Sequence, residues 1–229
     1  MTTVDAAGGT AQAGAPAEVA AEPAPTGLMA GNPALLGLPT FLAGSVALGL
    51  ALVGAQVPVG AYGAGLAIIL ASTALGLTIA TIWAIAIGQS AVAAVFGIFA
   101  GFWLSFVVLV LAVDHNWFAF ATPAAAGVPA SSIAVGAIQV FLISWLVIVV
   151  MLTLATLRLP LAFTVLFALV DLALIFVLAG TSSASTGDLK TAGIFVFAFA
   201  AVGIYLFFDA MAQGTGGKAF PLGRPIIKG

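Results

Sequence analysis

Side chains that could carry out acid–base, nucleophilic or metal chemistry are scarce in this chain of 229 residues. Asp171 is the main candidate, because it lies inside a long apolar segment, where a carboxylate is costly and needs a partner or a function. It could transfer a proton or act in gating, or it could be a neutral carboxyl group hydrogen-bonded to Thr153 or Thr164. The single histidine, His115, follows Asp114, and there we expect a solvated loop rather than a metal site.

Catalysis inside a membrane would need one of two arrangements, and the placement of the residues argues against both. A paired-aspartate hydrolase would need Asp171 and Asp209 at the same depth, whereas their predicted depths differ. A serine–histidine dyad would need His115 inside the membrane. The chain also has no cysteine, which removes thiolate nucleophiles and thiolate metal ligands. We therefore predict no catalytic residue, no metal and no cofactor.

The start of the first apolar segment offers a candidate binding feature. Asn32 suits a helix N-cap and Pro33 suits the first helical position. Pro39 cannot donate a hydrogen bond to the carbonyl of Leu35, so the pattern predicts a break in the helix there. A new helix N-terminus near Thr40 would present free N–H groups that suit a carboxylate. The alternative interpretation is an ordinary cap at Asn32 followed by a tolerated kink.

The amino-acid composition indicates which kind of secondary structure positions these residues. Charged residues make up 5% of the chain, against about 25% in soluble globular proteins, and hydrophobic residues make up 63%. Mean hydropathy is +1.31. Such a chain cannot cover a water-facing surface, and its few basic residues cannot build a nucleic-acid-binding face. We therefore expect an all-α membrane protein whose main partner is the lipid bilayer.

Gaps between charges set the number of helices. No charged residue lies between Glu22 and Asp114, and about 20 apolar residues cross a bilayer, so this stretch holds three spans. The rest of the chain has room for three more. We predict a disordered tail over 1–31, a six-helix transmembrane domain over 32–212 and a C-terminal tail over 213–229. The expected spans are 33–55, 61–88, 91–113, 133–157, 161–180 and 192–212, with a Ser- and Thr-rich loop over 181–191.

Basic residues set the expected orientation. Lys218, Arg224 and Lys228 follow the last span, and with six spans Arg158 falls on the same side as they do. Lys190 is the one exception. Because basic residues favour the cytoplasmic side, we expect a multi-pass protein of the cell membrane with both termini in the cytoplasm.

Small residues indicate close helix packing. Every fourth residue of the second span is small over four turns, a pattern that lets helix backbones approach in lipid and that serves either one bundle or a seam between protomers. The positions are Ser72, Gly76, Ala80, Ala84 and Gly88. Trp103 and Trp145, near the middle of their spans, are expected to pack in a core.

Four segments resemble a known family. The segment 32–38 reads N-P-A-L-L-G-L, 101–104 reads G-F-W-L, 156–158 reads T-L-R and 220–223 reads F-P-L-G. In this order they resemble motifs of the acetate uptake transporter family, also called GPR1/FUN34/YaaH. Leu35 departs from the family, which has proline there, so the resemblance places the helix break about one turn later.

The resemblance implies a function and an assembly. Family members are six-helix carriers or channels for acetate and related short-chain carboxylates such as succinate. Each protomer of a homo-oligomeric ring, a hexamer, contains its own pore. A weak acid crosses an apolar constriction more easily in its neutral form, which favours proton-linked passage. The alternatives are a non-transporting membrane scaffold or sensor and, on weaker grounds, the intramembrane hydrolase considered above.

The resemblance also implies site residues. By position, the narrowest part of the pore would be formed by Phe41, Phe99 and Phe167. Phe99 stands where the family often has tyrosine, so a hydroxyl is absent from this ring. Substrate entrance or binding would involve Asn32, Pro33, Leu36, Gly37 and Thr40, and proton coupling would involve Asp171.

Overall fold

The computed structural model describes residues 27–117 and 130–227. In this part of the chain the secondary structure is helical and contains no strand. Six helical stretches are long and apolar enough to cross a membrane, which confirms the predicted number. They are Ala34–Val53, Tyr62–Ala86, Ser90–Asp114, Ser132–Arg158, Leu161–Ser183 and Thr186–Gly214. The expected N-terminal tail falls almost wholly outside the described residues.

Four of the six stretches are single α-helices, and each of the other two consists of several consecutive helical segments. The single helices are α1 (Ala34–Val53), α4 (Ser90–Asp114), α6 (Leu161–Ser183) and α7 (Thr186–Gly214). The fourth crossing consists of α5 (Ala130–Ala155) and a 3-10 turn, Thr156–Arg158. The second crossing combines a 3-10 turn (Tyr62–Gly65), α2 (Leu66–Ile68), a π-helical segment (Ile69–Ala74) and α3 (Leu75–Ala86).

The predicted break at Pro39 is wrong, because α1 runs without interruption from Ala34 to Val53. The Thr40 hydroxyl donates to the carbonyl oxygens of Leu36 and Gly37 at 2.9 and 3.1 Å. Neither of these is the Leu35 carbonyl that Pro39 leaves without a donor, and the helix nevertheless continues, because proline is tolerated inside membrane helices. Consequently, no new helix N-terminus forms near Thr40.

The predicted loop over 181–191 is also wrong for most of its length. Helix α6 extends to Ser183 and α7 begins at Thr186, so the sixth span starts six residues before the predicted 192. The hydroxyls of Ser183 and Thr191 bond carbonyl oxygens one turn back, which lets a Ser- and Thr-rich sequence remain helical. Ser185 caps α7 by accepting a hydrogen bond from the Asp188 backbone N–H at 3.2 Å.

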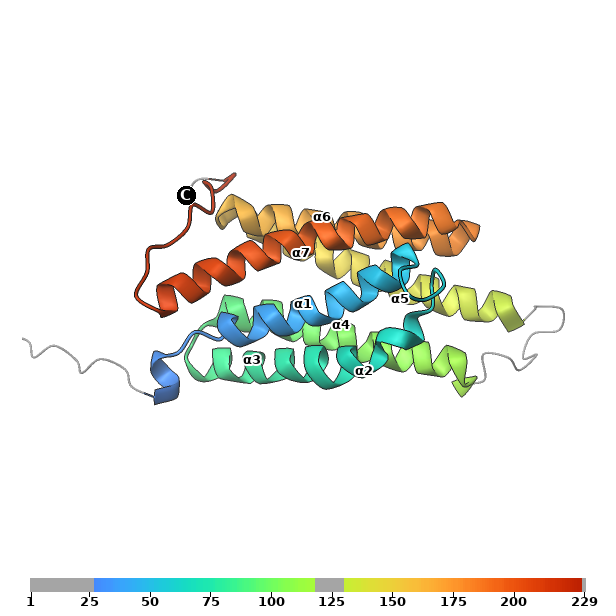
Figure 1. Cartoon of the computed structure of the whole chain (residues 1–229), viewed down its shortest axis with the longest axis horizontal. Helices are drawn as coiled ribbons and strands as arrows, with labels where there is room; N and C mark the ends of the chain where they lie inside the picture. The colour runs from blue at the N-terminus through green and yellow to red at the C-terminus, as the bar shows by residue number, and fades with distance from the viewer. Residues whose placement is uncertain (1–26, 118–129, 228–229) are drawn as a thin grey trace, which may run out of the picture.

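All long helices run along the same axis of the molecule (Figure 1). Helix α1 packs against α3 on one side and α7 on the other, α6 packs between α5 and α7, and α4 packs against α3. The start of α1 and the end of α7 lie at the same end of the bundle in Figure 1. This arrangement puts α1, α4, α6 and α7 around a common centre.

Close packing around α1 depends on glycine. A Cβ at Gly37 would collide with the Phe96 ring, and a Cβ at Gly76 would collide with the Thr40 side chain. Of the small-residue positions in the second span, Gly76, Ala80 and Ala84 are buried within the protomer. These three positions therefore serve packing inside one bundle.

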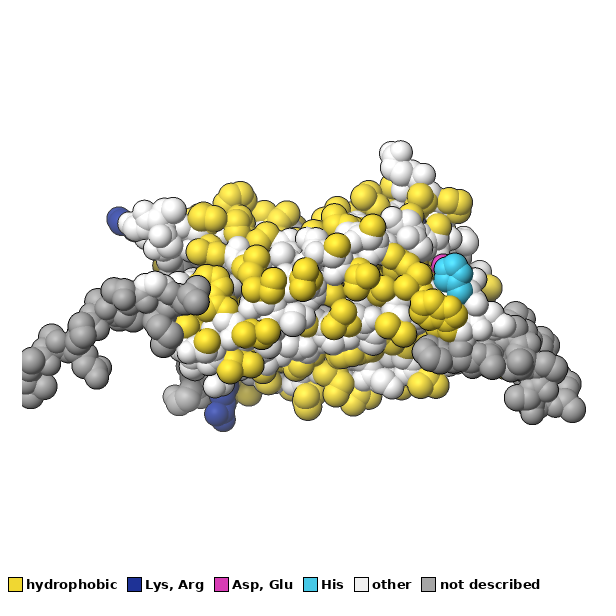
Figure 2. Space-filling view, turned by 90° about the horizontal axis from the view of Figure 1, so that it is seen from below, with side chains coloured by type: hydrophobic (Ala, Val, Ile, Leu, Met, Phe, Trp, Pro, Cys, Tyr) yellow, Lys and Arg dark blue, Asp and Glu magenta, His cyan; other side chains and the backbone are white. Residues whose placement is uncertain are grey.

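The surface matches a bilayer environment. Large apolar side chains such as Ile82, Ile85 and Val140 are more than 60% exposed. Figure 2 shows hydrophobic side chains spread over the middle of the molecule, whereas the Lys and Arg side chains on that face lie at the end where α7 finishes. Exposed apolar side chains in such numbers suit contact with lipid or with a neighbouring subunit.

The C-terminal segment folds back onto the bundle as a strap, residues 215–227. Asp209, near the end of α7, is 6% exposed. One of its carboxylate oxygens accepts the Phe220 backbone N–H at 2.7 Å, and the other accepts from Gln213 Nε2 at 2.9 Å. Further along, the Ala162 N–H donates to the Leu222 oxygen at 3.0 Å. The strap thereby joins the end of α7 to the start of α6.

Candidate functional site

Phenylalanine rings from separate helices meet at the centre of the bundle. Phe41 of α1 and Phe99 of α4 contact edge to face with ring centroids 4.9 Å apart, and Phe167 of α6 stacks on Phe99 at 5.8 Å. Their side chains are 6%, 4% and 3% exposed. Edge-to-face and offset-stacked rings at these spacings attract one another. The structure thus brings together the three residues that the family resemblance singled out.

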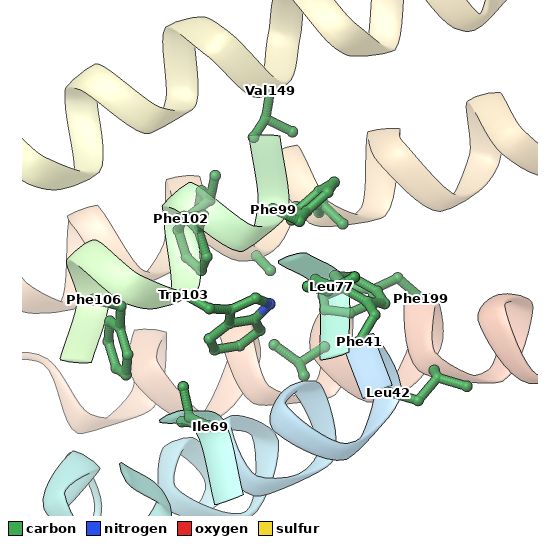
Figure 3. Close-up of a cluster of buried hydrophobic side chains, with 14 of the residues drawn as sticks. Phe41, Leu42, Ile69, Leu77, Phe99, Phe102, Trp103, Phe106, Val149 and Phe199 are labelled. Atoms are coloured by element: carbon green, nitrogen blue, oxygen red, sulfur yellow. The ribbon is translucent and has the colours of Figure 1, made fainter. Parts of the chain in front are cut away.

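A fourth ring joins them that the sequence reasoning missed. Phe199 of α7 lies 5.8 Å from Phe41 by ring centroids and is 4% exposed. Figure 3 shows Phe199 beside Phe41 in the buried cluster. No motif marks Phe199 in the sequence, where it is one of several phenylalanines in an apolar helix. Only the packing of α7 on α1 assigns it to the centre.

A small space of about 40 Å³ lies against these rings. Phe41, Phe99, Phe199 and Trp103 form part of its lining, together with aliphatic side chains of α5, α6 and α7. Because about 10–15 Å³ by this measure accommodates one water, the space could hold roughly three water-sized groups. Phe167 is not part of the lining but stacks on Phe99, which is. The chain therefore has a small apolar space at its centre, bordered by aromatic rings.

The proposed entrance residues occupy the first turns of α1, and their polar atoms are used within the helix. Asn32 Oδ1 accepts the Ala34 backbone N–H at 3.0 Å, as an N-cap does. The carbonyls of Leu36 and Gly37 accept the Thr40 hydroxyl. The structure does not bring these residues to the lining of the central space.

Asp171 lies on the side of α6 that faces α5. Its Oδ2 accepts a hydrogen bond from the Thr153 hydroxyl at 2.7 Å, so one of the two expected partners is confirmed. Thr164, the other, donates instead to the Thr156 carbonyl at 3.0 Å. Residues of α6 on another face, including Val170 and Leu174, line the central space. Asp171 is therefore next to the aromatic centre but is not part of it.

Metal binding finds no geometric support in the residues that the structure describes. Within residues 27–117 and 130–227, no group of three or more His, Cys, Asp or Glu side chains is close enough to hold a metal ion. His115 stacks on Trp117 with ring centroids 5.9 Å apart.

The chain resembles known proteins in sequence and in structure. The model of the GPR1/FUN34/yaaH family matches residues 8–217. A solved structure described as that of the bacterial acetate channel SatP aligns with a TM-score of 0.69 at 21% sequence identity, covering 84% of this chain and 99% of that one. No curated protein matches the chain. Because the family model covers most of the sequence, the chain belongs to the GPR1/FUN34/yaaH family.

Proposed function

We propose that this chain carries acetate and related short-chain carboxylates, including succinate, across the cell membrane. The observation that carries the proposal is the meeting of Phe41, Phe99 and Phe167 at the centre of a six-helix bundle, beside a space sized for a few heavy atoms. Membership of the family and the likeness to a bacterial acetate channel support it.

The three phenylalanines would act as the narrowest point of the path, here called the throat. Their rings touch and exclude water, so a permeating acid must lose its hydration shell before it passes. Dehydrating a charged carboxylate costs far more free energy than dehydrating the neutral acid. The throat would therefore favour passage of the acid together with its proton.

Asp171 is the residue that we propose for proton exchange. The Thr153 hydroxyl has one proton and two acceptors within reach, Asp171 Oδ2 at 2.7 Å and the Val149 carbonyl oxygen at 3.0 Å. When Asp171 is ionised, Thr153 donates to it. When Asp171 is protonated, it can donate to Thr153, which then bonds Val149. Both protonation states thus keep a hydrogen bond, as a reversible proton carrier needs.

The orientation and assembly are proposed on separate grounds. Arg158, Lys218 and Arg224 follow the fourth or the sixth crossing, so in a six-span topology they share one side, which we assign to the cytoplasm with both termini. A homo-oligomer, hexameric by family resemblance, would place one throat in each protomer. The entrance would lie near Asn32 and Pro33 at the start of α1.

Flux through liposomes that contain only this protein tests the function. We expect labelled acetate to accumulate in them along its gradient, and Phe41→Trp to reduce the rate at least about tenfold, because overpacking a closed aromatic centre is costly. Phe208→Trp is the matched control, since Phe208 is 55% exposed on the lipid-facing surface and should tolerate the larger ring. Absence of acetate flux from the unmodified protein would favour a scaffold or sensor and contradict the proposal.

A further inference from the structure

An open groove of about 520 Å³ lies on the surface of the bundle, where the strap meets α6 and α7. It is lined by three residues each from the start of α6, the second half of α7 and the strap. Ala162, Ala201 and Gly223 are the small residues of this lining, and they leave room between larger ones such as Leu161 and Tyr205. Figure 1 shows the strap beside the start of α6, at the end of the bundle where α7 finishes.

The polar groups around the groove are already used to hold the strap. The Tyr205 hydroxyl donates to the Pro221 carbonyl oxygen at 3.1 Å, and the Tyr205 ring lies 5.4 Å from the Phe220 ring by centroids. The Ala162 backbone N–H donates to the Leu222 oxygen. The surface that the groove offers to a ligand is therefore mainly apolar, which suits a hydrocarbon chain.

The strap and the turn before α6 run side by side next to the groove. The Ile227 backbone N–H donates to the Leu157 oxygen at 3.0 Å, and an added Cβ on Gly223 would lie 2.8 Å from the Leu161 side chain. Leu161 and Gly223 also line the groove, so these paired segments begin at its edge. Between the two contacts each segment contains one exposed arginine: Arg158 in the turn and Arg224 in the strap.

These two arginines have no acidic neighbour in the part of the chain that the structure describes. Asp114 and Asp188 belong to the opposite end of the bundle, at the end of α4 and the start of α7, and Asp171 lies within α6. Asp209 is near the strap, but it is buried and both of its carboxylate oxygens accept hydrogen bonds. Two neighbouring positive charges without a counter-ion repel each other and attract an anion.

We propose that the groove and the two arginines form a binding site for one anionic phospholipid. An acyl chain lies in the groove, and the lipid phosphate lies between Arg158 and Arg224, whose guanidinium groups match phosphate oxygens. Basic pockets beside transmembrane helices are a known way to hold lipid headgroups. A bound lipid contacts α6, α7 and the strap at once, so it also fastens the strap to the bundle.

The charge distribution favours a lipid over a second copy of the chain in this groove. Copies in one membrane share the same orientation, so a neighbouring copy presents Asp114 and Asp188 at the other side of the bilayer. Its residues at the depth of the groove include the same arginines, which would add to the repulsion. An anionic lipid supplies both the missing negative charge and the hydrocarbon.

Native mass spectrometry of the full-length protein in detergent tests the selectivity of the site. Phosphatidylglycerol and phosphatidylcholine with identical acyl chains are added in separate titrations, and the first lipid bound per protomer is followed. We expect the Kd for phosphatidylglycerol to be at least about tenfold lower, because only this lipid has a net negative charge. Glycerol phosphate, which has no acyl chain, should not displace it at equal concentration.

Variants at the arginines test the headgroup contact. Arg158→Gln and Arg224→Gln should each raise the Kd for phosphatidylglycerol about fivefold and leave that for phosphatidylcholine within about twofold. Arg224→Lys, which keeps the charge, should restore most of the affinity. Lys190→Gln is the matched control, because it removes an exposed positive charge near the start of α7, at the opposite end of the bundle.

A variant in the groove tests the acyl-chain contact. Ala201 is an exposed part of the lining, so Ala201→Phe fills the groove without entering the core, and it should weaken binding of both lipids several-fold. Ala94→Phe is the control, since Ala94 is an exposed residue of α4 outside the groove.

The possible results either support the lipid site or overturn it, and none depends on flux, so the transport proposal is tested separately. Equal Kd values for the two lipids would overturn it. An equal loss of affinity in Lys190→Gln would show general attraction to positive charge and would also overturn it. Unchanged lipid binding in Ala201→Phe would show that no acyl chain lies in the groove, and an altered oligomer mass in that variant would assign the groove to a second copy.

Discussion

In this protein, residues of the same type differ in exposure and in hydrogen-bond partners, and these differences decide which role each can have. Phe41 and Phe208 are the same side chain, yet the first is 6% exposed among other rings and the second 55% exposed. Asp171 and Asp209 are likewise both carboxylates in apolar helices. Asp209 is held by a backbone N–H and an amide, whereas Asp171 has one threonine partner and one unpaired oxygen. Such differences in partners separate a structural acid from a candidate proton carrier.

Replacing Asp171 tests its proposed part in proton exchange. Asp171→Asn preserves shape and the contact with Thr153 but cannot take up a proton near neutral pH. We expect acetate uptake into liposomes to continue and to lose most of its dependence on an imposed pH gradient. Thr153→Val should weaken that dependence only in part, because the carboxyl group remains. An unchanged pH profile in Asp171→Asn would show that the carboxyl group is only structural.

At the scale of helices, the sequence correctly predicted how many crossings there are, but it was wrong about where helices are interrupted. The gap in charge from Glu22 to Asp114 was enough to predict three crossings, because span length follows from bilayer thickness. The helical 181–191 segment was missed because serine and threonine hydroxyls can bond carbonyls inside a helix. The unbroken α1 was missed because proline is tolerated inside membrane helices. The π-helical segment Ile69–Ala74 was not predicted, because no residue pattern in the sequence marks its wider turn.

Because α1 is uninterrupted, we can predict how replacing Pro39 affects stability and flux. Pro39→Ala restores a backbone donor inside the helix, so we expect the protein to be as stable as before or more stable, by up to about 3 kcal/mol. Acetate flux should remain within about twofold of the original rate. Thermal unfolding in detergent and liposome flux measure the two effects. A large loss of flux would show that a break at Pro39 forms during transport.

Because α1 packs closely on the second crossing, we expect a larger side chain at Gly76 to lower the stability of the protein. Gly76→Leu would drive a side chain into Thr40 and should destabilise the protein by about 1–3 kcal/mol, because overpacking forces the helices apart. Gly88→Leu is a poor comparison because Gly88 has a positive φ of 74°. Gly136→Leu, with nothing within 4 Å of an added Cβ, is the matched control and should be tolerated. Equal unfolding temperatures for the two variants would contradict the packing argument.

At the scale of the whole molecule, the six-helix architecture could be predicted from the sequence, whereas several contacts at the centre of the bundle could be found only in the structure. Residue types and spacing located Phe41, Phe99 and Phe167 through the family resemblance, and the structure brings them into contact. Phe199 reaches the centre, and the C-terminal strap reaches its partners, only through contacts between segments that are distant in sequence. Periodicity cannot predict them, because the helices of this chain are apolar on nearly all sides and show no inner face.

The strap gives a prediction about the molecule as a unit. Asp209→Ala leaves the Phe220 N–H and the Gln213 amide without their buried acceptor, a loss of about 1–3 kcal/mol in the attachment of residues 215–227. We expect faster hydrogen exchange and earlier proteolysis in this segment, with the six helices unaffected. Asp188→Ala, at the other end of α7, is the control. Unchanged exchange in the strap would show that other contacts suffice to hold it.

In the proposed path, the touching phenylalanine rings would also act as an electrical insulator. A continuous column of water would let sodium, chloride and hydronium ions leak and run down the voltage across the membrane. Hydrocarbon faces in contact permit no such column. A cell could therefore keep many copies of this protein in its membrane at all times without discharging itself.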